Sequence, residues 1–304
     1  FLENAEKKTS KPKTLAIWRN FILLCFGLIH MSIWIGDVLA PYAICAFLLI
    51  IFPDVKKPIL IFLAIVFLMI AFIVITNYFS SLYDTNGNLI SDEEWILLAS
   101  EGGELSYGKF WFPDSESFGN LVGMWWYIGA FFRAISLMLF GILLYKLNII
   151  QGKKNIVFYK KMAVYGFSVG LPLSIYSIYL LVSTDYDPSV LFISNIFNTL
   201  SVIPMVLGYT GVLTILNLKL RDSISTRLQA CGKLAFTNYI TQTLFGVFFI
   251  GAFRLDTFSR SELIIFVFLV WIIQIAWSKP ILEKFNYGPL EWVWRKLTYR
   301  FIKI

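Results

Sequence analysis

Long apolar runs constrain this chain more than any other feature of its sequence. A membrane-spanning helix needs about 20 mainly apolar residues to cross a hydrocarbon core about 30 Å thick. Eight runs approach that length, and we predict a spanning helix in each. The eight are Leu15 to Trp34, Asp37 to Phe52, Pro58 to Phe79, Leu121 to Leu147, Met162 to Val182, Val190 to Leu216, Ala230 to Phe253 and Leu263 to Trp277. Because the second is short and contains Pro41, the first two are either two spans or a re-entrant pair.

Composition supports the same class of protein. The 304 residues are 58% hydrophobic and only 15% charged, whereas about a quarter of the residues of a soluble domain are charged. We therefore predict an all-α, polytopic membrane bundle in one domain over residues 1–304. This composition disfavours a secreted disulfide scaffold, a coiled coil and a disordered chain. The net charge of +7 does not predict a nucleic-acid partner, because the cations are spread between apolar runs.

The basic residues predict the orientation in the membrane. Lys and Arg concentrate in cytoplasmic segments, and 22 of the 26 in this chain lie in alternate connections and the two terminal segments. These are Lys7 to Arg19, Lys56 and Lys57, Lys146 to Lys161, Lys219 to Lys233, and Lys279 to Lys303. We therefore expect a multi-pass protein of the cytoplasmic membrane with both ends of this chain in the cytoplasm.

Two segments outside the apolar runs differ from the rest of the chain in composition. Residues 80–120 are rich in Asp and Glu and contain one basic residue, Lys109, so we place them outside the cell, either as a solvated loop or as a substrate gate. Residues 286–304 form a basic, aromatic tail. Pro289 suits the first position of a helix, and Glu291 suits the first turn. We expect this tail to lie at the cytoplasmic membrane interface.

His30, the only histidine, lies near the predicted outer end of the first run. An ionisable group inside a membrane is a functional candidate, and neutral imidazole can act as a general base. Asp37 follows seven residues later and shares the helical face, about 10 Å away, and a break at Gly36 would bring it closer. It could orient the imidazole, cap the second helix, or both. The alternative for His30 is a hydrogen-bonding residue at the interface.

Arg133 lies near the middle of the fourth run, where a charge costs about 2.5–3.5 kcal/mol. We expect a carboxylate, an anionic ligand or snorkelling to compensate for this cost.

Asn238 and Gln242 share one face of the seventh run, because they are four residues apart. They either join helices or line a cavity. Lys233, at the inner end of the same run, is either a topology charge or a phosphate contact. No metal site is predicted, because the chain has one histidine and its three cysteines show no CxxC spacing.

Several stretches resemble one family. The tail Asn286-Tyr-Gly-Pro-Leu-Glu-Trp-Val-Trp-Arg-Lys-Leu-Thr-Tyr299 resembles the closing signature of the YeiB-like bacterial membrane proteins, a domain of unknown function. Gly232 to Gln242, Arg133 to Lys146, and His30 with Gly36 and Asp37 are also similar to it. Members of that family begin with extra helices carrying an Arg…Asp…Arg-Gly motif, which this sequence lacks. We therefore expect further helices to precede Phe1.

This resemblance implies a function. The family is grouped with transmembrane acyltransferases, which take acyl groups from cytoplasmic acyl-CoA and acylate a sugar across the membrane, using an intramembrane histidine. By that analogy His30 is the acyl acceptor or the general base, and Arg133 and Lys233 contact CoA or a carboxylate. The acceptor expected here is a glycan or lipid of the cell envelope. A homo-oligomer is also compatible with the sequence. The alternatives are a small-anion transporter built around Arg133, and a non-catalytic scaffold or immunity-type protein.

Overall fold

The computed structural model describes residues 5–7, 9–34, 37–50, 55–80, 121–184, 188–219, 222–253 and 260–300. Within these ranges the regular structure is entirely helical. Most of the predicted acidic loop, residues 81–120, lies outside the described residues. The chain divides into two compact units, Ile51–Lys219 and a second unit made of Phe1–Ile50 with Leu220–Ile304.

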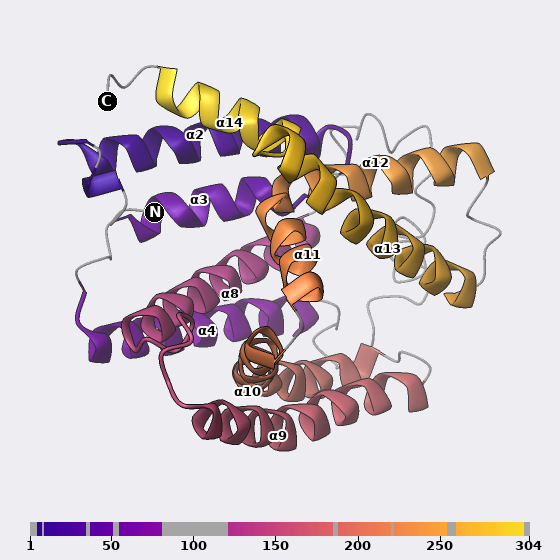
Figure 1. Cartoon of the computed structure of the whole chain (residues 1–304). Coiled ribbons are helices and arrows are strands. Elements are labelled where there is room, and N and C mark those ends of the chain that lie inside the picture. Colours follow the sequence, from indigo (N-terminus) through magenta and orange to yellow (C-terminus); the bar gives the residue numbers. More distant parts are fainter. Residues whose placement is uncertain are drawn as a thin grey trace. The chain divides into compact units, whose positions relative to one another are not determined.

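The unit Ile51–Lys219 contains two helix pairs, α4 (Lys57–Ser80) with α8 (Leu121–Lys146), and α9 (Ile156–Ser183) with α10 (Pro188–Lys219) (Figure 1). Small side chains let α9 and α10 approach closely, as expected for helices in lipid. A Cβ atom on Gly166 would lie only 2.4 Å from the backbone nitrogen of Gly208. Farther along the pair, the hydroxyls of Ser177 and Ser194 are 2.8 Å apart and buried.

Among the described residues the second unit contains six helices: α2 (Pro12–Met31), α3 (Leu39–Leu49), α11 (Asp222–Lys233), α12 (Ala235–Phe253), α13 (Arg260–Phe285) and α14 (Pro289–Arg300). α14 begins at Pro289 with Glu291 in its first turn, so the predicted tail helix is confirmed. The apolar run that was predicted from Ala230 is divided between α11 and α12 at Leu234. The division has a physical cause, because Glu291 accepts the backbone N–H of Thr237 in the first turn of α12.

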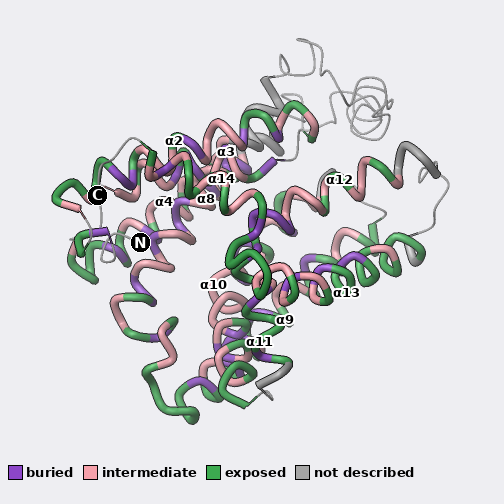
Figure 2. Tube along the Cα trace, turned by 45° about the horizontal axis from the view of Figure 1, so that its top comes forward, coloured by how far each residue is buried: buried purple, intermediate pink, exposed green. Residues whose placement is uncertain are grey.

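Apolar side chains cover the outside of the long helices. Phe62 of α4, Tyr165 of α9 and Phe268 of α13 each expose more than half of their surface, and buried positions lie where helices face one another (Figure 2). Soluble monomers rarely expose such large apolar areas. Six described helices are long and apolar enough to span a membrane: Pro12–Met31, Lys57–Thr76, Ile128–Lys146, Ile156–Ser183, Val190–Lys219 and Glu262–Phe285. With α3 and α12 as further apolar helices, this confirms the predicted all-α membrane bundle of about eight helices.

α3 is too short to cross a bilayer. Its 11 residues measure about 16 Å at 1.5 Å per residue, about half of a 30 Å hydrocarbon core. It packs back against α2. This hairpin favours the re-entrant alternative, in which the basic residues before α2 and those at Lys56 and Lys57 lie on the same membrane face, in agreement with the charge pattern.

Labelling of a cysteine in the hairpin turn tests this arrangement. In a cysteine-free background of the full-length protein, we expect Ser32→Cys to resist a membrane-impermeant maleimide added outside the cell. Thr184→Cys, at the end of α9 that the charge pattern places outside, is the control and should react. Labelling of Ser32→Cys as fast as Thr184→Cys would instead show two complete spans.

A substitution at Gly27 tests how tightly the hairpin packs. A Cβ atom there would lie 2.5 Å from the backbone nitrogen of Ala40 and 2.8 Å from its Cα, so the backbone of α3 would have to move. We expect Gly27→Ala to lower stability by about 1–3 kcal/mol, the usual range for overpacking, measured as a lower melting temperature. Gly246→Ala is the control, because a Cβ atom on Gly246 meets no atom within 4 Å. An equal change in both variants would contradict close packing.

Candidate functional site

His30 and Asp37 form a buried hydrogen-bonded pair. His30 Nδ1 lies 2.7 Å from Asp37 Oδ1, and the two side chains are 2% and 0% exposed. α2 ends at Met31, and the chain turns back before α3 begins at Leu39. In a continuous helix His30 and Asp37 would be about 10 Å apart, but the turn brings their side chains into direct contact.

Asp37 also starts α3. Its Oδ2 accepts the backbone N–H of Ala40 at 2.8 Å, which satisfies one of the donors left free at a helix N-terminus. The capping role and the histidine contact were predicted as alternatives that can hold together, and this geometry contains both. One carboxylate therefore fixes the start of α3 and the orientation of the imidazole.

Tyr239 is a member of this cluster that the sequence analysis missed. Its hydroxyl donates to Asp37 Oδ1 at 3.2 Å and accepts the backbone N–H of Val38 at 3.2 Å. Its ring centroid lies 5.1 Å from that of His30. The only sequence signal was its place beside Asn238 in the Gly232 to Gln242 motif. The contact joins the end of α2 to the first turns of α12.

The two imidazole nitrogens of His30 differ in their surroundings. Nε2 is buried and has no hydrogen-bond partner among the described residues. Buried polar atoms are nearly always satisfied, and an exception calls for a functional or structural explanation. Because Nδ1 lies against Asp37, Nε2 is the ring nitrogen that is left for another partner. This is the arrangement in which a histidine can accept a proton from a substrate.

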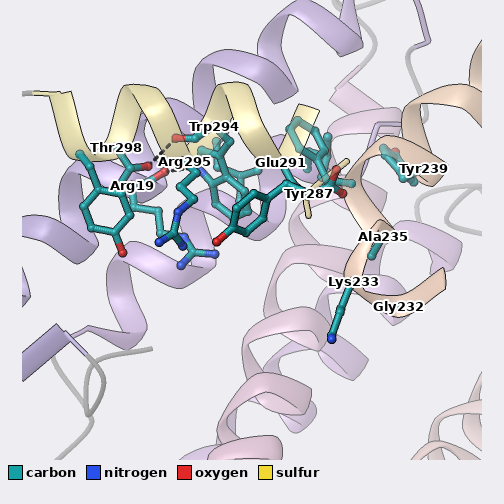
Figure 3. A pocket seen from close by; sticks show the side chains of 14 residues that line it. Arg19, Gly232, Lys233, Ala235, Tyr239, Tyr287, Glu291, Trp294, Arg295 and Thr298 are labelled. Atoms are coloured by element: carbon teal, nitrogen blue, oxygen red, sulfur yellow. Dashed lines mark hydrogen bonds between the residues drawn. The ribbon is translucent and has the colours of Figure 1, made fainter. Parts of the chain in front are cut away.

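A cavity of about 500 Å³ approaches this cluster. It is lined by residues of α2, α3, α11, α12 and α14, together with Tyr287 (Figure 3). Tyr239 belongs both to its wall and to the His30 cluster. The three basic residues of its wall are Arg19, Lys233 and Arg295. Lys233 thus lies where a ligand in the cavity could reach it, although its predicted contact with substrate remains a prediction.

Glu291 joins the tail helix to α12 beside the same cavity. Its carboxylate accepts the backbone N–H of Thr237 at 2.9 Å and also the Thr237 hydroxyl. The hydroxyl in turn accepts the backbone N–H of Leu290 at 3.2 Å. Glu291 is the only carboxylate among the described residues of the cavity wall, and both of its oxygens are engaged within the protein.

Asn238 and Gln242 join helices. The Asn238 amide donates to Ser278 at 3.2 Å and accepts from the Trp277 indole at 2.9 Å. Gln242 donates to Gln274 at 2.8 Å, and Gln274 donates to the Asn238 carbonyl. Neither side chain is among those that line the cavity. This geometry matches the helix-packing alternative for the two residues, and their predicted substrate contacts remain predictions.

Arg133 belongs to the other unit and is bonded to an amide. Its Nη2 donates to Asn198 Oδ1 at 2.7 Å. The described residues of Ile51–Lys219 contain no Asp or Glu, so the expected carboxylate is not found among them. The amide oxygen of Asn198 accepts one hydrogen bond of the guanidinium, but a neutral amide does not balance the positive charge of Arg133.

The comparisons with known proteins identify the family. The model of a protein family of unknown function, DUF418, matches residues 144–301, just over half of the chain. The chain belongs to the DUF418 family. This confirms the resemblance to YeiB-like proteins. The matched region contains Lys233, Tyr239 and Glu291, whereas His30 and Asp37 precede it.

Three relatives support this assignment. The uncharacterized protein YxaH of Bacillus subtilis is 27% identical over 98% of this chain and 75% of its own length. The uncharacterized protein YeiB of Escherichia coli is 44% identical over 75 residues, which are 23% of this chain and 19% of YeiB. An uncharacterized 39.9 kDa protein of Bacillus acidopullulyticus is 32% identical over 30% of this chain and 27% of its own. No solved structure matches this DUF418 protein.

The Glu291 contact predicts the effect of a substitution in the DUF418 motif region. Thr237→Val keeps the size of the side chain but removes the hydroxyl that bonds Glu291 and Leu290. Leaving such partners unsatisfied costs about 1–3 kcal/mol, so we expect a clearly lower melting temperature. Thr210→Val is the control, since among the described residues the Thr210 hydroxyl bonds only to the carbonyl of Val206 in its own helix. Equal melting temperatures for the two variants would show that the contact does not hold α14.

Proposed function

We propose that this protein transfers acyl groups from cytoplasmic acyl-CoA to a hydroxyl or amine of an extracytoplasmic glycan or lipid. The observation that carries the proposal is the buried imidazole of His30, with Nδ1 held by Asp37 and Nε2 without a partner in the described part of the chain. Family membership supports the proposal by analogy, because we group the family with transmembrane acyltransferases.

Each residue of the cluster has a defined role in such a reaction. His30 Nε2 would take the proton of the acceptor hydroxyl or amine as that group attacks the thioester carbonyl. The carbon–sulfur bond breaks, and the imidazolium returns the proton to the departing thiolate. Asp37 would hold the ring and stabilise its positive charge, as the carboxylate of a catalytic triad does. Tyr239 would position Asp37 by donating to its Oδ1.

The surroundings of the pair suit a reaction within the membrane. The charge pattern places His30 toward the outer end of its run and the start of α12 toward the inner face. Because Tyr239, one turn into α12, contacts Asp37, we place the pair within the membrane rather than at its outer surface. Tyr239, which bonds to Asp37, lines the cavity together with Arg19, Lys233 and Arg295, which suits an anionic donor from the cytoplasm.

The test is release of the CoA thiol from acetyl-CoA by the purified full-length protein, with a cell-envelope extract as the source of acceptor. We expect His30→Gln to lower the rate 10²- to 10⁴-fold, the usual contribution of general base catalysis, with the melting temperature unchanged. Tyr239→Phe should lower the rate more modestly, and Tyr42→Phe, on the exposed side of α3, serves as its control. An unchanged rate in His30→Gln would reject the role of His30.

A second candidate, a small-anion transporter, is favoured by the positive charge of Arg133, since the described residues of its unit hold no carboxylate. The same preparation distinguishes the two functions. Anion uptake into vesicles without acyl-CoA, abolished by Arg133→Gln and retained in His30→Gln, would favour transport over acyl transfer.

A further inference from the structure

The connection between α8 and α9 is a tightly bonded loop (Figure 1). Asn148, at φ 58°, donates its backbone N–H to the Tyr145 carbonyl, and the backbone N–H of Ile149 donates to the Leu144 carbonyl. This pair of bonds is a Schellman motif, which ends a helix with one left-handed residue. The side chains of Leu144 and Ile149 share a buried cluster with Tyr159, and the Tyr159 hydroxyl donates to the Ile149 carbonyl at 2.7 Å. The loop therefore has one defined shape.

A cavity of about 460 Å³ lies between this loop and the C-terminal part of α10, within the unit Ile51–Lys219. The loop contributes Ile150, Gln151 and Gly152 to its wall, and α10 contributes one helical face that includes Leu213 and Thr214. A volume of this size falls in the range of small-molecule sites. Because the loop is held in one shape, its part of the wall exists before any ligand binds.

The Gln151 side chain leaves one hydrogen bond unmade in this wall. Its Nε2 donates to the Tyr145 carbonyl at 2.9 Å, which fixes the orientation of the amide. Its Oε1 is buried and has no hydrogen-bond partner among the described residues. Nearly all buried polar atoms are bonded, so an exception calls for an explanation. A ligand that carries a hydrogen-bond donor into the cavity would supply the missing bond.

Thr214 adds a second acceptor on the α10 side of the wall. Its hydroxyl donates to the carbonyl of Thr210, one turn earlier in the same helix, at 2.8 Å. A hydroxyl has one proton and two lone pairs, so the Thr214 oxygen keeps acceptor capacity after its proton is engaged. The oxygens of Gln151 and Thr214 are therefore complementary to a ligand with hydroxyl or ammonium groups.

Charged and apolar residues adjoin the cavity on the same segments. Lys153 and Lys154 directly follow Gly152 and are exposed, and the charge pattern predicts that this end of α10 faces the cytoplasm. Ile150 and Leu213, in the wall itself, each expose more than half of their surface. Cations beside exposed apolar side chains are typical of the level where phospholipid headgroups meet their acyl chains.

We propose that this cavity binds the glycerol headgroup of an anionic phospholipid, whose hydroxyls donate to Gln151 and Thr214. The lipid phosphate would contact Lys153 or Lys154, and the acyl chains would lie along the exposed apolar side chains. A choline headgroup has no N–H or O–H to donate. An ethanolamine headgroup has donors, but its lipid has no net charge to match the lysines. The inference concerns lipid binding alone and holds whether or not the protein transfers acyl groups.

Native mass spectrometry of the purified full-length protein tests the proposal. Phosphatidylglycerol, phosphatidylethanol, phosphatidylethanolamine and phosphatidylcholine with identical acyl chains are added in equal amounts. Phosphatidylethanol is the matched ligand, because it has the charge of phosphatidylglycerol but no headgroup hydroxyl. We expect phosphatidylglycerol to be retained about fivefold over phosphatidylethanol, the effect of roughly one net hydrogen bond, and more strongly still over the two zwitterionic lipids.

Two variants test the acceptors separately. Gln151→Met keeps the length of the side chain but removes Oε1, so the preference for phosphatidylglycerol over phosphatidylethanol should fall to about one. Thr214→Val keeps the size of the side chain and leaves the loop unchanged, so it should lower the same preference even if Gln151→Met disturbs the loop. Because the two lipids have equal charge, a general change in membrane affinity would not alter their ratio.

Paired lysine variants test the phosphate contact. The double variant Lys153→Gln/Lys154→Gln should lower retention of phosphatidylglycerol and phosphatidylethanol alike by tenfold or more. Lys160→Gln/Lys161→Gln is the matched control, since these two exposed lysines lie on α9 and do not line the cavity, and it should retain both lipids nearly as the wild type does.

Several results would overturn the proposal. Equal retention of phosphatidylglycerol and phosphatidylethanol by the wild type would show that no headgroup hydroxyl is recognised. Stronger retention of phosphatidylethanolamine would show that the occupant is an ammonium group instead. Equal losses in the two double lysine variants would show that binding reflects only the overall charge of this part of the protein.

Discussion

The carboxylate of Asp37 is the interaction on which the candidate site depends. It accepts hydrogen bonds from Tyr239 and from the backbone of Ala40 and lies 2.7 Å from His30 Nδ1, so it links the ends of three helices. A single buried charge can hold so many groups because, in a medium of low dielectric constant, hydrogen bonds to a charged atom are strong. The same carboxylate lies against His30 Nδ1, which leaves Nε2 without a hydrogen-bond partner among the described residues.

The C-terminal helix completes the same unit. Glu291 bonds to the first turn of α12, and the tryptophans of α2 and α14 donate to carbonyls of the opposite helix. These polar contacts run between elements more than fifty residues apart in the chain, and residues of the same elements line the cavity. In lipid, apolar side chains gain little by leaving their surroundings, so specific hydrogen bonds and close packing carry more of the structure.

The two polar regions of the protein differ in how their charges are balanced. The His30 cluster contains its own acid, whereas the Arg133 guanidinium is satisfied by the amide of Asn198, and no carboxylate occurs among the described residues of its unit. The Arg19 and Arg295 pair is held by aromatic rings. Amide and aromatic side chains of the protein thus orient these arginines.

The sequence by itself determined the class of the protein and the residues to examine. A run of about 20 apolar residues crosses a bilayer as a helix, because the backbone polar groups must be bonded within the protein. Charged residues are rare within these runs, and this rarity drew attention to His30, Asp37 and Arg133. The tail motif also predicted the helix from Pro289 and the family. Tertiary structure decided the partners: Tyr239 for Asp37, Asn198 for Arg133, Glu291 for Thr237, and Arg295 beside Arg19. Periodicity and composition describe one segment at a time, whereas these contacts depend on how helices distant in sequence pack, which only the folded chain determines.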